Sequence, residues 1–137
     1  MKNFCVAVAV ATATLLSGCA STSAPKALPA CQPAHGPDYP TTDSALSDAD
    51  ANGTWCVVVG QTFTITLNVP IAQGDARWDP VAPADRSVLE PISNGVVALP
   101  RGVTATFFTV RKAGVVTVSS TRPDGAKWQA TVVAKSA

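Results

Sequence analysis

The feature that most constrains this chain is a two-residue alternation of apolar and polar side chains that starts after Gly53. In the run TFTITLN, residues 62–68, Phe63, Ile65 and Leu67 alternate with threonine. Successive side chains of a β-strand point to opposite faces of the sheet, whereas a helix repeats about every 3.6 residues. The run therefore predicts a half-buried strand with its threonines facing water.

Further apolar runs follow at short intervals, and turn signals rich in glycine and proline separate them. They cover residues 54–59, 88–92, 96–99, 103–110, 115–120 and 127–133. We also expect a short strand around Trp78, and we expect Phe107 rather than Phe108 to point inward. No window has the apolar spacing of an amphipathic helix. About seven strands at this spacing predict one all-β domain, an immunoglobulin-like antiparallel β-sandwich over residues 53–137.

Residues 1–18 have the composition of a leader. Lys2 provides the positive start, and an apolar run follows it. A helix needs about 20 residues to cross a bilayer, and this run is shorter. The border sequence Leu16-Ser17-Gly18-Cys19 resembles the bacterial lipobox, in which the leader is cut before a cysteine that carries acyl chains. The resemblance implies that residues 1–18 form a lipoprotein signal peptide and that Cys19 is lipidated. It places the domain outside the cytoplasm on a lipid anchor, at the cell membrane or the outer membrane.

Residues 19–52 are rich in small and polar side chains. Such a segment buries too little apolar surface to offset the entropy of ordering it, so we expect a flexible tether after the lipidated cysteine.

Two cysteines are left once Cys5 has been removed with the leader and Cys19 carries lipid. They are Cys31 in the tether and Cys56 in the first strand. In an exported chain they either form a disulfide, closing a loop of about 25 residues worth about 3 kcal/mol, or remain two free thiols; we expect the disulfide.

The sequence DADANG, Asp48–Gly53, matches the opening of a calcium loop, with oxygen ligands at alternate positions and a glycine at the turn. Val59 stands where such a loop carries its bidentate glutamate, and a polar turn before the first strand explains the same residues. We therefore predict no metal site and no cofactor, while calcium binding at Asp48–Gly53 stays open.

The chain has few groups from which to build a catalytic site. Its single histidine, His35, lies in the tether, where nothing is expected to hold it for acid–base or nucleophilic chemistry. The sequence has no glycine-rich phosphate loop after a strand. The 10 Lys and Arg residues nearly balance the 9 Asp and Glu residues, so the chain lacks the clustered positive charge that binds nucleic acid. We predict a non-enzymatic protein that does not bind nucleic acid.

Four signals, in the order in which they occur, resemble the chagasin-type inhibitors of cysteine peptidases and related bacterial immunoglobulin-like lipoproteins. They are the opening VVVGQTFTITLN, a tryptophan after the next loop, TFF shortly before KAG, and a tryptophan at the start of the last strand. The resemblance implies an immunoglobulin-like sandwich that blocks papain-like peptidases with three loops. The family's first-loop core, Thr-Thr-Gly-Tyr, is absent here, and the Arg-Pro pair of the third loop is separated from its tryptophan.

The positions that the resemblance carries over are Asn68, Pro70, Gly74 and Trp78 in the first loop, Gly95 and Gly102 in the second, and Arg122, Pro123 and Trp128 in the third. Since successive antiparallel strands turn at alternate ends, the segments 68–77, 92–102 and 121–127 should gather at one end of the sandwich. For the tryptophans at 78 and 128, two roles stay open: filling the core, or standing exposed as anchors for a partner.

These observations predict a membrane-anchored cell-envelope lipoprotein that binds a protein partner through its loops. A papain-like peptidase is the partner that the family resemblance implies, and the chain would act as its inhibitor. The alternative is a structural envelope lipoprotein without a discrete ligand. Exposed tryptophan or arginine in the loops favours binding, and buried tryptophans favour the structural protein.

Overall fold

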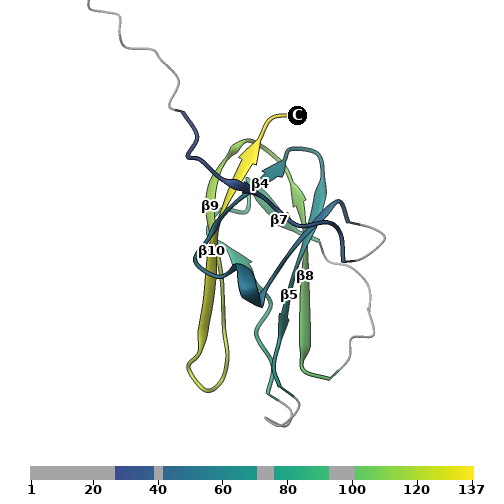
Figure 1. Cartoon of the computed structure of the whole chain (residues 1–137), viewed down its shortest axis with the longest axis vertical. Coiled ribbons are helices and arrows are strands. Elements are labelled where there is room, and N and C mark those ends of the chain that lie inside the picture. The colour runs from purple at the N-terminus through teal and green to yellow at the C-terminus, as the bar shows by residue number, and fades with distance from the viewer. Residues whose placement is uncertain (1–26, 39–41, 71–75, 93–100) are drawn as a thin grey trace, which may run out of the picture.

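The computed structural model describes residues 27–38, 42–70, 76–92 and 101–137, and it is a sandwich of two β-sheets (Figure 1). One sheet has five strands in the order β2-β4-β10-β9-β6, and the other has four in the order β3-β5-β8-β7. The five-stranded sheet contains β2 (Gln32–Pro33), β4 (Thr54–Val58), β10 (Lys127–Lys135), β9 (Gly114–Thr121) and β6 (Ala82–Pro83). The four-stranded sheet contains β3 (Ser44–Ser47), β5 (Thr62–Asn68), β8 (Val103–Val110) and β7 (Leu89–Pro91). The prediction of an all-β sandwich is confirmed.

The core lies between the two sheets and is built from the alternating residues. Phe63, Ile65 and Leu67 of β5 are fully buried, as predicted. Phe63 stacks on Phe108 of β8, with ring centroids 5.1 Å apart, and β9 contributes Val118 from the facing sheet. Burial of each such side chain contributes about 1.5–3 kcal/mol to folding.

The outer face of the four-stranded sheet differs from the prediction. β5 is a central strand, and Thr64 has Ala45 of β3 on one side and Phe107 of β8 on the other. All three side chains are buried, so Thr64 does not face water. The expectation that Phe107 points inward is wrong, because it belongs to this outer row while Phe108 packs in the core. Both faces of the sheet bury a phenylalanine here, so apolarity alone could not tell the two faces apart.

The directions of the strands differ from those of a purely antiparallel sandwich. β5 pairs antiparallel with β8, and β9 pairs antiparallel with β10. However, β4 runs parallel to β10, and β3 runs parallel to β5. Alternation of side chains shows which face of a strand is buried, and it carries no information on the direction of the neighbouring strand.

The segment before residue 53, predicted to be a flexible tether, contributes strands to both sheets. β2 pairs with β4, β3 pairs with β5, and Leu46 of β3 is fully buried in the core. The predicted domain start at residue 53 is therefore wrong, because the described residues from 42 to 52 belong to the sandwich. The strand expected around Trp78 is also wrong, since β6 lies four residues later at Ala82–Pro83. The leader, Cys19 and the run 96–99 lie outside the described residues.

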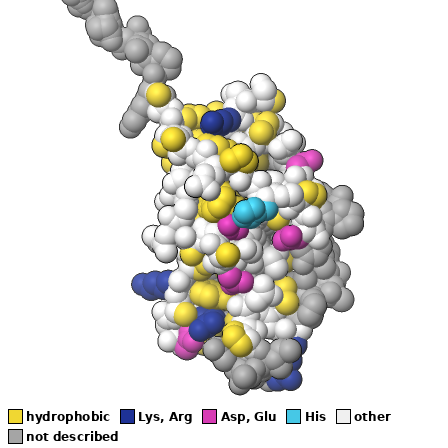
Figure 2. Space-filling view, in the orientation of Figure 1, with side chains coloured by type: hydrophobic (Ala, Val, Ile, Leu, Met, Phe, Trp, Pro, Cys, Tyr) yellow, Lys and Arg dark blue, Asp and Glu magenta, His cyan; other side chains and the backbone are white. Residues whose placement is uncertain are grey.

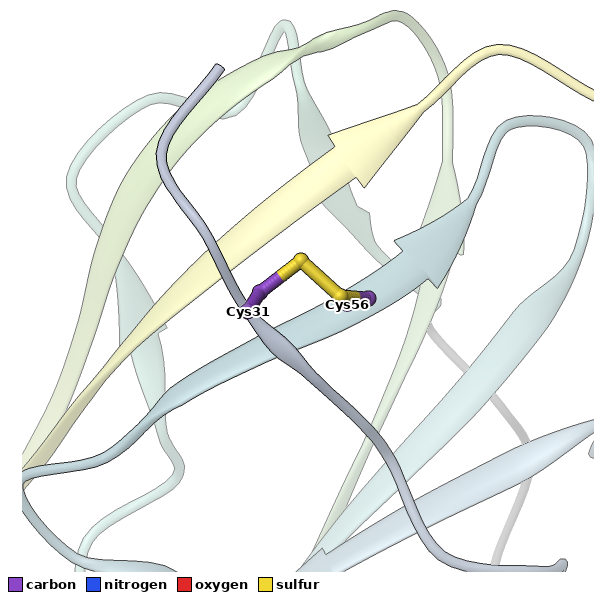
Figure 3. The surroundings of a disulfide bond; sticks show 2 residues. All are labelled: Cys31 and Cys56. Atoms are coloured by element: carbon purple, nitrogen blue, oxygen red, sulfur yellow. A yellow bond between two sulfur atoms is a disulfide. The ribbon is translucent and has the colours of Figure 1, made fainter.

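The predicted disulfide between Cys31 and Cys56 is confirmed (Figure 3). The two Cα atoms lie 5.3 Å apart, a spacing that is ordinary for a disulfide. The bond joins the N-terminal segment to β4 where β2 pairs with it, since Pro33 is in register with Cys56. The segment that leads into the sandwich is thus covalently fixed to it.

His35 fastens the same segment a second time, contrary to the expectation that nothing would hold it. Its backbone exchanges two hydrogen bonds with Ala45, of 3.0 and 2.9 Å. Its ring Nε2 lies 2.7 Å from Oδ1 of Asp50, in the 3-10 helix η2 (Asp48–Asp50), and Oδ2 of the same carboxylate accepts a hydrogen bond from the Ser47 amide. The Asp50 side chain is buried, while the His35 ring is largely exposed on the face shown in Figure 2.

Candidate binding surface

The described parts of the predicted loops meet at one end of the sandwich, which is the lower end in Figure 1. β5 ends there at Asn68, which pairs with Val103 at the start of β8. The hairpin between β9 and β10 closes at the same end, where Thr121 pairs with Lys127. The described parts of the first and third loops and the end of the second therefore lie together, as the order of the strands predicts. We call this end of the sandwich the loop end.

Trp78 connects the first loop to its surroundings. Its indole Nε1 donates a hydrogen bond of 3.1 Å to the carbonyl oxygen of Asn68, and its own carbonyl accepts one of 2.8 Å from the Thr104 hydroxyl. The guanidinium of Arg122 lies over the Trp78 ring, with Cζ 5.0 Å from the ring centroid. A cation at this distance is attracted to the face of the ring, so the contact joins the first loop to the third.

Arg122 is held by its own hairpin. Its Nε and Nη2 donate hydrogen bonds of 3.1 and 2.6 Å to the two carboxylate oxygens of Asp124. Hydrogen bonding to Arg122 lowers the pKa of the Asp124 carboxyl, and the same bonding raises the pKa of Arg122. The Arg122 side chain is 15% exposed, so its guanidinium supports the hairpin and does not reach out toward solvent.

The two tryptophans of the predicted loops are core residues. Trp78 is 9% exposed and Trp128 is 4% exposed, and both belong to the cluster between the sheets. Of the two roles left open by the sequence, filling the core is the one observed. The alternative role, in which an exposed tryptophan anchors a partner, is not observed for either residue.

The remaining predicted loop residues differ in exposure. Pro70 and Pro123 are exposed, whereas Gly102 is buried. The carbonyl oxygen of Gly102 accepts a hydrogen bond of 2.9 Å from the Val69 amide, which ties the second loop to the first. Gly74 and Gly95 lie outside the described residues.

Other residues of the loop end are exposed, in contrast to Trp78 and Arg122. Pro70, Arg77, Pro123 and Lys127 are exposed. The Arg77 Nη1 donates a hydrogen bond of 3.0 Å to the carbonyl of Val103, so this side chain is also oriented. Exposed prolines and an oriented arginine, in loops supported by a rigid sandwich, are suited to docking against another protein.

Asp48 is a residue of this end that the sequence reasoning did not assign to it. Its carboxylate accepts hydrogen bonds from the backbone amide of Asn68, at 3.0 and 3.1 Å, and from the Asn68 Nδ2 at 3.1 Å. The motif DADANG had suggested calcium, but these carboxylates are engaged in hydrogen bonds within the chain. The sequence contains one signal for the short strand that brings Asp48 here, because the apolar pair Ala45-Leu46 lies between Asp43 and Asp48.

Among the described residues, no three His, Cys, Asp or Glu side chains come together in a way that could hold a metal ion. Within the same ranges, no helix has the length and apolarity needed to cross a membrane.

Comparison with known proteins identifies related folds. No family model matches the chain, and no curated protein matches it in sequence. A solved structure with a similar fold is that of the cysteine protease inhibitor EhICP2 from Entamoeba histolytica, at a TM-score of 0.54 and 12% identity over 76% of this chain and 97% of that one. The solution structure of Amebosin gives a TM-score of 0.42 at 13% identity, over 66% of this chain and 96% of that one. PbICP-C, solved in complex with falcipain-2, gives 0.40 at 8% identity, over 77% of this chain and 99% of that one. The similarity to the Entamoeba inhibitor shows that the two chains share an immunoglobulin-like sandwich fold.

Proposed function

We propose that this protein binds a papain-like cysteine peptidase through its loop end and inhibits it without catalysing a reaction. The observation that carries the proposal is the connection of the first and third loops into one surface by Asn68, Trp78 and Arg122. The fold shared with EhICP2, itself a cysteine protease inhibitor, supports the choice of partner.

The proposed surface inhibits by fitting its loops, already ordered, into a cleft of the peptidase. An inhibitor gains affinity when its loops are already ordered, because ordering them on binding would cost free energy. Arg122 and Trp78 provide this order, and the exposed Pro123 and Pro70 of the loop end provide the part that enters a cleft. Arg122 is thus assigned a supporting role, and the hydrogen bonds offered to the partner come from exposed groups around it.

A titration tests the inhibition. The full chain, purified in a mild detergent, is titrated against papain-like peptidases with a fluorogenic peptide substrate. We expect inhibition with a micromolar or tighter constant.

Two hairpin tips at opposite ends of β9 give a matched pair of variants. Pro123 and Ala113 are both exposed, but Pro123 lies at the loop end and Ala113 lies in the turn between β8 and β9. Pro123→Arg adds a long cation to the proposed contact and should weaken inhibition by about ten-fold or more, as losses at the centre of an interface do. Ala113→Arg adds the same group and should leave inhibition unchanged. Equal effects of the two variants would contradict docking through the loop end.

The burial of Trp78 and Trp128 favours a second candidate, a structural envelope protein without a discrete ligand. A core tryptophan stabilises the sandwich and offers no side chain to a partner. Absence of inhibition across a panel of papain-like peptidases would support this second function.

We also propose that Cys19 carries a lipid that anchors the protein at the cell membrane or the outer membrane, with the domain outside the cytoplasm. The lipobox resemblance supports this, and the disulfide between Cys31 and Cys56 fits an oxidising compartment. Cys19→Ala should abolish incorporation of radiolabelled palmitate, whereas Cys5→Ala should retain it. Normal labelling of the Cys19→Ala protein would contradict the anchor.

A further inference from the structure

Two aspartates flank β3 and hold opposite ends of its neighbour β5. At the start of β5, Oδ2 of Asp43 accepts hydrogen bonds from the Thr62 amide and hydroxyl, at 2.9 and 3.2 Å. At the end of β5, the Asp48 carboxylate accepts from the Asn68 amide and from its Nδ2. The two carboxylates make the same kind of contact, but Asp48 makes it at the loop end.

The contact made by Asp48 continues into the proposed binding surface. Asn68, whose amide is fixed by Asp48, offers its carbonyl oxygen to the indole of Trp78 at 3.1 Å. The Trp78 ring in turn lies beneath Arg122, which is bonded to Asp124 in the third loop. A continuous chain of contacts therefore runs from η2, through the first loop, to the third.

We propose that Asp48 is a positioning residue of the peptidase-binding surface, fixing Asn68 so that Trp78 and Arg122 hold the first and third loops together. Asp48 itself is not required to touch the partner. The proposal rests on the proposed function for its link to inhibition, while its structural step can be measured without any partner.

The structural step is measured by hydrogen exchange at tryptophan indoles in the ¹⁵N-labelled full chain in detergent. Asp48→Ala should speed exchange of the Trp78 indole N–H by about ten-fold, because the variant removes a charged acceptor that holds the Asn68 backbone. Asp43→Ala removes the matching contact at the other end of β5 and should leave this rate unchanged. Asp48→Asn keeps one acceptor oxygen and should give an intermediate rate.

Trp55 is an internal control for loss of the whole turn. Its indole Nε1 donates to the carbonyl of Asp50 at 2.9 Å, in the same 3-10 helix that contains Asp48. If Asp48→Ala speeds Trp78 and leaves Trp55 unchanged, the positioning role is supported. If both indoles exchange faster to the same extent, or neither does, the positioning role is overturned.

The inhibition assay supplies the second readout. Asp48→Ala should weaken inhibition of a papain-like peptidase by about ten-fold, and Asp43→Ala should not. If the unmodified chain inhibits and Asp48→Ala inhibits equally well, this inference fails while the proposed function stands. If the unmodified chain does not inhibit, the proposed function fails, and the indole rates still decide whether Asp48 positions the loop end.

Discussion

At the residue scale, the loop end depends on a close approach between Gly102 and the backbone of Val69. The backbone of Gly102 has φ of 82°, and a Cβ atom added there would lie 2.7 Å from the Val69 carbonyl oxygen. Gly125, in the β9–β10 hairpin, has a similar φ of 90°, but a Cβ atom there would meet nothing within 4 Å. The two glycines therefore separate the cost of the backbone conformation from the cost of the close contact.

Alanine at these two positions should destabilise the protein to different extents. Both variants place a side chain in the left-handed region, which costs about 1–2 kcal/mol. Gly102→Ala must also displace a backbone carbonyl that cannot rotate away, so we expect a further loss of about 1–3 kcal/mol in the free energy of unfolding. Urea unfolding of the two variants measures the difference. Equal midpoints would show that the contact with Val69 does not constrain the loop end.

At the element scale, the long strands could be predicted from the sequence, whereas the short strands β2 and β3 could not. The runs 62–68 and 103–110 became β5 and β8 with the same bounds, because seven or eight residues are enough to show an alternation. β3 has four residues and β2 has two, so neither can show a period. Both are held by neighbouring strands, and β2 is held also by the adjacent Cys31–Cys56 bond; these are properties of the assembled sandwich.

The same distinction applies to the candidate binding surface. The meeting of the loops follows from strand order, and counting cysteines led to the correct disulfide. The contacts that orient the surface could not be read in this way, because Asp48 meets Asn68 and Trp78 meets Arg122 only after distant segments have packed. Burial of a tryptophan at a loop border likewise depends on the strands that cover it.

At the scale of the whole molecule, the N-terminal segment closes one side of the sandwich. β2 is an edge of the five-stranded sheet and β3 is an edge of the four-stranded sheet. His35, just after β2, forms a β-bridge with Ala45 of β3. The N-terminal segment therefore pairs with β4 in one sheet and with β5 in the other, and it links the two edges. An uncovered edge exposes unpaired backbone groups that favour association with other chains.

A chain that starts at residue 53 should therefore fail to form a stable sandwich, whereas one that starts at residue 27 should form it. The shorter chain loses the fully buried Leu46, worth about 1.5–3 kcal/mol, and the disulfide, worth about 3 kcal/mol. It also loses both aspartate contacts to β5, and domains of this kind are stable by about 5–15 kcal/mol in total.

Urea unfolding followed by near-ultraviolet circular dichroism compares the two chains. The longer chain carrying Cys31→Ser and Cys56→Ser separates the disulfide from the strands, and it should unfold at an intermediate urea concentration. Cooperative unfolding of the shorter chain at the midpoint of the longer one would mean that β2 and β3 are dispensable and that the sandwich is complete from residue 53.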